Sequence, residues 1–303
     1  MPEITPRSWI MVATLGFVWG ASFLGIELAL RGVTPFWLVA YRLGFAALLT
    51  VIVWRLRGGR IVRPQDGKRR WPFLLVAALF SSVIPFTLLS WGQQHVTSAT
   101  AGVSMAAVAL VVMPMAHFFS VGERMTPRRV FGMLVGFGGV LVLLGDGLFQ
   151  SSGAALENWG RLACFGAACC YAISSVTTRN CPPIDPIAMG AITMVIAAGA
   201  AVPLAIATEG APPLPDLTTL LVLIMLGMVQ TAGANLLRIL VIRSAGSTFM
   251  SLTNYQVPFW SMIFGAAFLG EPLPAGLFIA LGLILSGMGM SQWDPFRNLF
   301  RKR

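Results

Sequence analysis

The stretch SWIMVATLGFVWGASFLGIELAL, residues 8–30, carries one charged residue, Glu27, in an otherwise uncharged and mostly apolar run. A helix of about 20 such residues is long enough to cross a bilayer core of about 30 Å. Backbone groups inside lipid have no water to bond to, so a spanning segment must satisfy its own hydrogen bonds, as a helix does. The run is long, no small-residue cleavage site follows it, and further apolar runs come after it. We therefore interpret it as a membrane helix and not as a signal peptide.

The rest of the chain is built from similar runs. Of its 303 residues, 56% are hydrophobic and 11% are charged, whereas a soluble domain has about 25% charged residues. Charged or Pro/Gly-rich breaks separate the runs, and nothing suggests the alternating strands of a barrel. The predicted fold is an all-α integral membrane protein with ten transmembrane helices, near residues 8–30, 36–54, 72–92, 97–120, 128–146, 159–179, 186–208, 217–240, 244–269 and 274–293.

The distribution of basic residues predicts the orientation of these helices. If the N-terminus is cytoplasmic, eighteen of the 21 Lys and Arg residues fall in inside segments, Arg31 and Arg161 lie outside, and Arg42 lies within a helix. Short cytoplasmic loops carry the excess of positive charge in membrane proteins. We therefore expect a multi-pass protein of the inner (plasma) membrane with both termini cytoplasmic. The basic residues form no face of a soluble domain, so the net charge of +10 indicates anionic lipid and not nucleic acid as the partner.

Two Gly-Glu turns mark an internal repeat. Gly122-Glu123 follows the fourth predicted helix, and Gly270-Glu271 follows the ninth, 148 residues later. We therefore divide the chain into a first five-helix repeat, residues 1–150, and a second, residues 151–303. Because five is odd, the halves cross the membrane in opposite directions. Many secondary transporters have such inverted repeats, with the substrate site near the midplane between the halves. The alternative is an old duplication without functional residues.

The motif Trp19-Gly20-Ala21-Ser22-Phe23 in the first helix resembles the Trp-Gly-x-x-Phe signature of EamA-type members of the drug/metabolite transporter superfamily. The ten spans, the duplication and the two Gly-Glu turns also resemble that family, over nearly the whole chain. A proline usually precedes each turn in mid-helix; Pro258 fits this pattern, whereas Pro114 lies closer to its turn. Within the superfamily the chain is most similar to YddG-type exporters of aromatic amino acids. The resemblance implies an outward basket-like cavity between the halves and export of amphiphilic metabolites.

Few ionisable residues lie inside the predicted spans, where they are costly and usually functional. Glu27 and Arg42 lie at similar depth near the outer face, so we predict that they contact each other. The pair would form an outer gate or bind the charged groups of a zwitterion. Alternatively it is a static ion pair, or Glu27 pairs with Arg31 one turn away. No span carries a carboxylate at mid-depth, which argues against proton-for-cation antiport and against organic cations as substrates.

Uncharged polar and aromatic residues are more numerous within the spans. Amides are expensive in lipid, and aromatic residues far from the interfaces do not belong to the interfacial belt. Core packing and hydrogen bonds between helices are the alternative explanation. We predict a cavity lined by Trp19, Ser22, Phe23, Phe86, Ser90, Tyr171, Ser174, Gln230, Asn235, Asn254, Tyr255, Gln256 and Trp260. His95, at the outer end of the third helix, is either a gating residue beside Glu27 and Arg42 or an ordinary interfacial group.

These features favour a secondary transporter that exports aromatic and other neutral amino acids by alternating access, with a drug or other small-metabolite exporter as the alternative. A structural or receptor-like scaffold is the remaining option. The four cysteines lack paired C-x-x-C spacing and no H-E-x-x-H pattern occurs, so we expect no enzyme activity, metal or cofactor. Gly16-x-x-x-Gly20 and Gly132-x-x-x-Gly136 are expected to pack helices of one chain, which we expect to function as a monomer.

Overall fold

The computed structural model describes residues 5–59, 67–119, 126–145, 156–182, 184–245, 247–250, 252–291 and 293. Within these ranges the chain is helical, with turns and short connections and no strand. Six helical stretches there are long and apolar enough to cross a membrane: Pro6–Leu30, Pro35–Leu56, Arg70–Gly92, Ser98–Phe119, Pro186–Glu209 and Leu217–Val241. The predicted all-helical class is confirmed. The turn Gly122-Glu123 lies outside the described residues.

Each span expected from the sequence coincides with one helix or with consecutive helices. The first half contains α1 (Pro6–Leu30), α2 (Pro35–Leu56), α3 (Gly67–Ala78), the π-helical segment η2 (Leu79–Val83), α4 (Ile84–Gly92), α5 (Ser98–Ala106), α6 (Val108–Phe119) and α7 (Pro127–Gly145). The second half contains α8 (Glu157–Asn180), α9 (Pro186–Glu209), α10 (Leu217–Ile224), the π-helical segment η3 (Met225–Gly233), α11 (Ala234–Ala245), α12 (Ser247–Met250), α13 (Thr253–Leu269) and α14 (Ala275–Ser291).

Four of the expected spans are not regular single helices. The span at 97–120 is divided at Ala107 into α5 and α6, and the span at 244–269 is divided into α12 and α13. The spans at 72–92 and 217–240 each contain a π-helical segment. Adding the repeat offset of 148 residues to η2, residues 79–83, gives 227–231, which lies inside η3. The two π-helical segments are therefore separated by about the same number of residues as the two Gly-Glu turns.

Local capping explains where several helices begin. The side chains of Thr5, Thr97, Asp185 and Asp216 accept hydrogen bonds from backbone N–H groups in the first turns of α1, α5, α9 and α10. These N–H groups have no partner within the helix, so a side-chain oxygen at this position stabilises the helix start. Proline opens α1, α2 and α9, where its fixed φ suits the first helical position.

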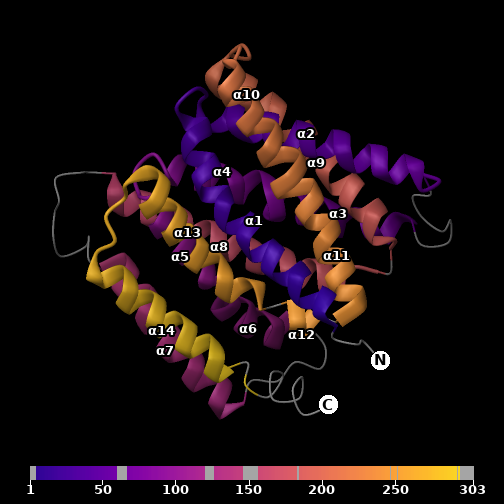
Figure 1. Ribbon diagram of the computed structural model, residues 1–303. Coiled ribbons are helices and arrows are strands. Elements are labelled where there is room, and N and C mark those ends of the chain that lie inside the picture. Colours follow the sequence, from indigo (N-terminus) through magenta and orange to yellow (C-terminus); the bar gives the residue numbers. More distant parts are fainter. Residues whose placement is uncertain are drawn as a thin grey trace.

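Glycines allow the closest helix contacts. A methyl group at Gly287 of α14 would lie 2.5 Å from the backbone nitrogen of Gly136 in α7, and Figure 1 shows these two helices side by side at one edge of the bundle. In α1, Gly16 and Gly20 lie against Gln256 and Trp260 of α13. Both glycine motifs therefore pack helices of one chain, as predicted.

Burial follows the pattern of a protein surrounded by lipid. Large apolar side chains point outward, for example Phe118 at 76%, Leu141 at 68% and Phe268 at 69% exposure. Small and polar side chains lie inside, including Ser90 and Ser261, both fully buried. Such a surface would be unstable in water. It suits a bilayer, where packing and hydrogen bonds between helices replace the hydrophobic effect.

Two glutamates link the halves by capping helices of the first half. Glu271, after α13, accepts hydrogen bonds from the backbone N–H and hydroxyl of Ser98 at 2.8 and 2.9 Å, and from the Ala99 N–H at 3.1 Å. Glu209, the last residue of α9, accepts from the Thr34 hydroxyl and from the Trp37 N–H at the start of α2. A carboxylate at a helix N-terminus also interacts favourably with the helix dipole.

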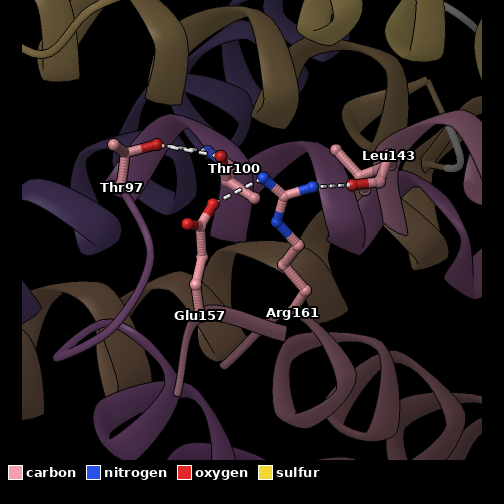
Figure 2. A network of polar contacts seen from close by, with 5 residues as sticks. All are labelled: Thr97, Thr100, Leu143, Glu157 and Arg161. Atoms are coloured by element: carbon pink, nitrogen blue, oxygen red, sulfur yellow. Dashed lines mark hydrogen bonds and ion pairs between the residues drawn. The ribbon is translucent and has the colours of Figure 1, made fainter. Parts of the chain in front are cut away.

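A third polar contact joins α7 to α8. Figure 2 shows Arg161 between the carbonyl of Leu143 and the carboxylate of Glu157. Arg161 donates hydrogen bonds of 2.9 Å to the carbonyl and 2.5 Å to the carboxylate. The start of α5 lies beside this group, where the Thr97 hydroxyl accepts a hydrogen bond from the Thr100 N–H. The Arg161–Glu157 ion pair lies within one helix and is partly exposed. Its contribution to stability is therefore small.

Candidate functional site

Arg42 of α2 is the charged residue at the centre of the candidate site. Its side chain is 4% exposed. Its Nε donates a hydrogen bond of 2.8 Å to the hydroxyl of Thr231, and its guanidinium carbon lies 3.9 Å from the centroid of the Phe86 ring. This distance is typical of a cation–π contact, which is stronger when it is shielded from water. A buried, positively charged group thus lies between hydrogen-bonding and aromatic partners.

The hydrogen bond to Thr231 depends on the π-helical segment η3. The Thr231 hydroxyl donates to the carbonyl of Leu226, five residues earlier, at 2.8 Å, and thereby leaves its oxygen free to accept from Arg42. Adjacent to it, Gly227 allows α2 to approach, because a methyl group there would lie 2.6 Å from the carbonyl of Arg42. π-helical segments occur frequently at functional sites. Here one of them positions the acceptor that orients the guanidinium.

Tyr171 of α8 completes the arrangement, because it lies near Arg42 and packs against the apolar cluster that contains Phe86. We call Arg42, Phe86, Tyr171 and Thr231 the Arg42 cluster. Its members come from α2 and α4 in the first half of the chain and from α8 and η3 in the second half. Sequence reasoning identified Arg42, Phe86 and Tyr171 as site residues. Thr231 was missed. The signal that could have indicated it is that Gln230 and Thr231 form a polar pair in an apolar span, with Gly227 and Gly233 on either side.

The predicted contact between Glu27 and Arg42 is wrong. No carboxylate in the described part of the chain lies within ion-pair distance of Arg42. The charged groups near Glu27 are instead those of Glu271 and Arg31. Equal depth in the membrane did not imply contact, because the two side chains leave their helices on different faces. The alternative pairing of Glu27 with Arg31 does not form an ion pair in the described structure either.

Two further predicted residues lie near the cluster. Gln230 is 4% exposed, and its amide oxygen is buried without a hydrogen-bond partner, close to Gly25 of α1. Ser90, one turn beyond Phe86 in α4, is fully buried and its hydroxyl also lacks a partner in the described structure. Buried polar atoms are normally paired, so each of these exceptions marks a place where a ligand or water would bind.

Other predicted lining residues are engaged in helix packing. Ser22 donates to the carbonyl of Val18 in its own helix, at 3.3 Å. Phe23 is packed in an apolar cluster with Leu89. Ser174 is buried in α8, one turn from Tyr171. For these side chains the structure favours the packing alternative.

The residues predicted on α13 do not join the Arg42 cluster. The ring of Trp260 lies 5.2 Å from that of Phe17, which is 46% exposed, and 5.9 Å from that of Phe264. These contacts place Trp260 on the outer side of the α1–α13 contact. Gln256 packs against Gly16 on the same contact. Trp19 of α1 packs against apolar residues of α1 and α11 and also against the apolar cluster of Phe23 and Leu89, which Tyr171 contacts as well.

Of the four remaining predicted residues, three lie at contacts between helices. Tyr255 packs with the apolar cluster formed by α5, α7 and α14. Asn235 of α11 faces Gly190 of α9. Asn254 is half-buried in α13. The ring of His95 lies 4.7 Å from that of Trp91, and its Cβ packs against Gly160 of α8. This placement supports the interfacial alternative for His95.

Comparison with known proteins identifies relatives over nearly the whole chain. The family described as the EamA-like transporter family matches residues 7–145 and again residues 158–291. The S-adenosylmethionine/S-adenosylhomocysteine transporter of Chlamydia trachomatis is 26% identical over 305 residues, which cover 93% of this chain and 88% of that protein. The uncharacterized transporter YvbV of Bacillus subtilis is 27% identical over 289 residues, 93% of this chain and 90% of that protein. One solved crystal structure shares the fold, with a TM-score of 0.65 at 20% identity over 95% of this chain and 98% of that one.

Proposed function

Because this chain belongs to the EamA-like transporter family, we propose that it exports amino acids, aromatic and other neutral ones among them, across the inner membrane. The observation that carries this proposal is the Arg42 cluster. A buried cation beside two aromatic rings suits a solute that has a carboxylate and an apolar or aromatic side chain. The proposal includes no enzyme activity, and we expect the monomer to be the functional unit.

We further propose that the chain crosses the membrane ten times, as two inverted five-helix repeats, residues 1–150 and 151–303. The family match to each half supports this arrangement, as does the spacing of η2 and η3. An even number of spans places both termini on one side, and the distribution of basic residues favours the cytoplasm. The Arg42 cluster combines residues of both halves, and transporters of this architecture bind substrate between their two halves.

Alternating access would proceed by movement of one half against the other around this cluster. The irregular points of the helices are where such movement is easiest. The π-helical segments η2 and η3 and the breaks between α5 and α6 and between α12 and α13 interrupt regular hydrogen bonding. Pro114 lies in α6 and Pro258 in α13, and proline removes a further backbone hydrogen bond.

The second candidate is export or exchange of another small metabolite. It is favoured by the relative from Chlamydia trachomatis, which is named for S-adenosylmethionine and S-adenosylhomocysteine. Both compounds contain an α-amino-acid group attached to a large group with an aromatic purine ring. The same pairing of a cation with aromatic rings would suit the amino-acid group and the purine of both compounds. S-adenosylmethionine also carries a positively charged sulfonium, so the two candidate functions differ in both the size and the charge of the side chain that the site must accept.

Counterflow in proteoliposomes tests the proposal directly. Vesicles containing the purified full-length protein are loaded with unlabelled phenylalanine and exposed to labelled phenylalanine, with and without a pH gradient. Accumulation of label above that in protein-free vesicles supports amino acid transport, and accumulation without a gradient shows that no proton coupling is needed. A parallel series with S-adenosylmethionine decides between the candidates. If the folded protein moves S-adenosylmethionine and not phenylalanine, the first candidate is refuted.

A further inference from the structure

Arg42 is a buried cation without an anionic partner. Moving a guanidinium out of water costs several kcal/mol unless an opposite charge compensates for it. The partners found for it are the neutral Thr231 hydroxyl and the face of the Phe86 ring, and Tyr171 lies nearby. No ion pair to Arg42 occurs in the described ranges of the chain. No described side chain therefore compensates the positive charge of Arg42.

The guanidinium also has donors to spare. Nε is committed to Thr231, and neither terminal nitrogen has a hydrogen-bond partner among the described residues. The planar fork of an arginine matches the two oxygens of a carboxylate, which it binds through two parallel hydrogen bonds. The bond to Thr231 and the stacking on Phe86 hold this fork in a fixed orientation, so little conformational freedom would be lost on binding.

An unpaired acceptor is found on the same π-helical segment. Gln230 immediately precedes Thr231, and its amide oxygen is buried without a partner. An ammonium group donates up to three hydrogen bonds and accepts none, so it suits an unpaired carbonyl oxygen. The described site thus provides spare donors for an anion at Arg42 and a spare acceptor for an ammonium at Gln230.

We propose that Arg42 is the receptor for the substrate's carboxylate, with Gln230 as an acceptor for its ammonium group, so that the site selects carboxylates carrying an aromatic or apolar group and rejects amines that lack a carboxylate. This inference rests on the proposed transport function and specifies its substrate class. It assigns Arg42 to substrate recognition and not to an outer gate with Glu27.

The experiment compares three probes that share a phenyl ring and differ in their charged groups. Phenylalanine carries both groups, 3-phenylpropionate carries only the carboxylate, and phenethylamine carries only the amine. Binding is measured as the shift in thermal unfolding temperature of the purified full-length protein in detergent. We expect phenylalanine and phenylpropionate to raise this temperature and phenethylamine to leave it unchanged. If phenethylamine binds as strongly as the carboxylates, or if none of the three binds, the proposal is overturned.

Substitutions then assign the selectivity to Arg42. Arg42→Gln should weaken binding of phenylpropionate by about ten- to a hundredfold, the effect of losing a charge-assisted hydrogen bond pair. Arg42→Lys, which keeps the charge and loses the planar fork, should fall between it and the wild type. Arg31→Gln removes an exposed arginine between α1 and α2 and should bind as the wild type does. Unchanged affinity in Arg42→Gln would overturn the proposal.

The ligand-free proteins separate a recognition role from a structural one. Removal of an unpaired buried cation relieves a desolvation cost, so ligand-free Arg42→Gln should unfold at or above the wild-type temperature. A clear decrease in that temperature, with ligand binding retained, would show a structural role and contradict the inference.

Transport assays distinguish failure of this inference from failure of the proposed function. Selective binding of carboxylates through Arg42, without counterflow of any amino acid, would support the recognition site and refute amino acid transport. Counterflow of phenylalanine that is as fast in Arg42→Gln as in the wild type would support transport and refute the role of Arg42.

Discussion

Replacement of Glu271 by alanine should destabilise the protein strongly, although Glu271 lies in a connection between helices. Its carboxylate accepts hydrogen bonds from two backbone N–H groups at the start of α5 and from the Ser98 hydroxyl, at 2.8 to 3.1 Å. Ser98 and Ala99 are both fully buried, so water cannot replace the carboxylate. An unsatisfied buried donor costs about 1–3 kcal/mol, and loss of the favourable charge at a helix N-terminus costs about 0.3–1 kcal/mol.

Together these losses predict that Glu271→Ala lowers the free energy of unfolding by about 3 kcal/mol. Glu271→Gln keeps one carbonyl acceptor and loses the charge, so we expect about half of that effect. Glu157→Ala is the control, because its carboxylate also lies at a helix start but forms a partly exposed ion pair, and such pairs contribute about 0–1 kcal/mol. Reversible unfolding in mixed detergent micelles provides the comparison. The reasoning is refuted if Glu271→Ala is no more destabilising than Glu157→Ala.

Three further predictions concern helix contacts and caps. Gly20→Ala should destabilise the protein by about 1–3 kcal/mol, because the added methyl group would collide with α13. Gly138→Ala, whose new methyl group has no atom within 4 Å, should be neutral or slightly stabilising. Unfolding curves of the two variants check this. Asp216→Asn should lower the unfolding temperature at neutral pH and have no effect in acid. The hydrogen bond from the Thr219 side chain lowers the pKa of Asp216. A carboxylate with a lowered pKa stabilises the folded state at pH values above its unfolded-state pKa, and this stabilisation is lost as the pH falls through its folded-state pKa. Equal effects of the substitution at both pH values would contradict this. Glu209→Ala removes the cap of α2 and should lower the free energy of unfolding by about 1–2 kcal/mol. If Glu209→Gln lowers it equally, the charge of Glu209, and not its hydrogen bonds, dominates the stabilisation of the helix start.

Sequence reasoning located the helices well because each is bounded by an unambiguous local signal. The run of residues 8–30 has too few charges to be anything but a lipid-compatible helix, and the glycine motifs predicted which helices could approach closely. The same reasoning missed the π-helical segments, since the residues of η2 and η3 are as apolar and helix-compatible as their neighbours. A π-helical segment arises when tertiary contacts, such as the approach of α2 to Gly227, favour one extra residue in a turn.

The candidate site was only partly predictable for a related reason. Periodicity assigns a residue to one face of its own helix but does not say which neighbouring helix that face meets. It singled out Arg42, Phe86 and Tyr171 as site residues, and the fold brings these three near one another. It also paired Arg42 with Glu27 on depth alone, whereas the charged groups near Glu27 are those of Glu271 and Arg31. Trp260 was expected in the cavity for its mid-span position, yet its ring packs beside exposed Phe17.

The sequence by itself therefore determined the class of this protein, its helical segments and the residues whose charge or polarity must have a purpose inside a membrane. These follow from local physical chemistry, because each apolar run must satisfy its own backbone hydrogen bonds. Only the tertiary structure decided which side chains meet, since contacts between helices depend on the rotation of each helix about its axis and on distortions within it. The rotation of α2 and its neighbours places a neutral hydroxyl and the face of an aromatic ring beside Arg42, in place of the expected carboxylate. The positive charge of Arg42 is therefore left without an anionic partner, and this observation leads to the proposal that it binds a substrate.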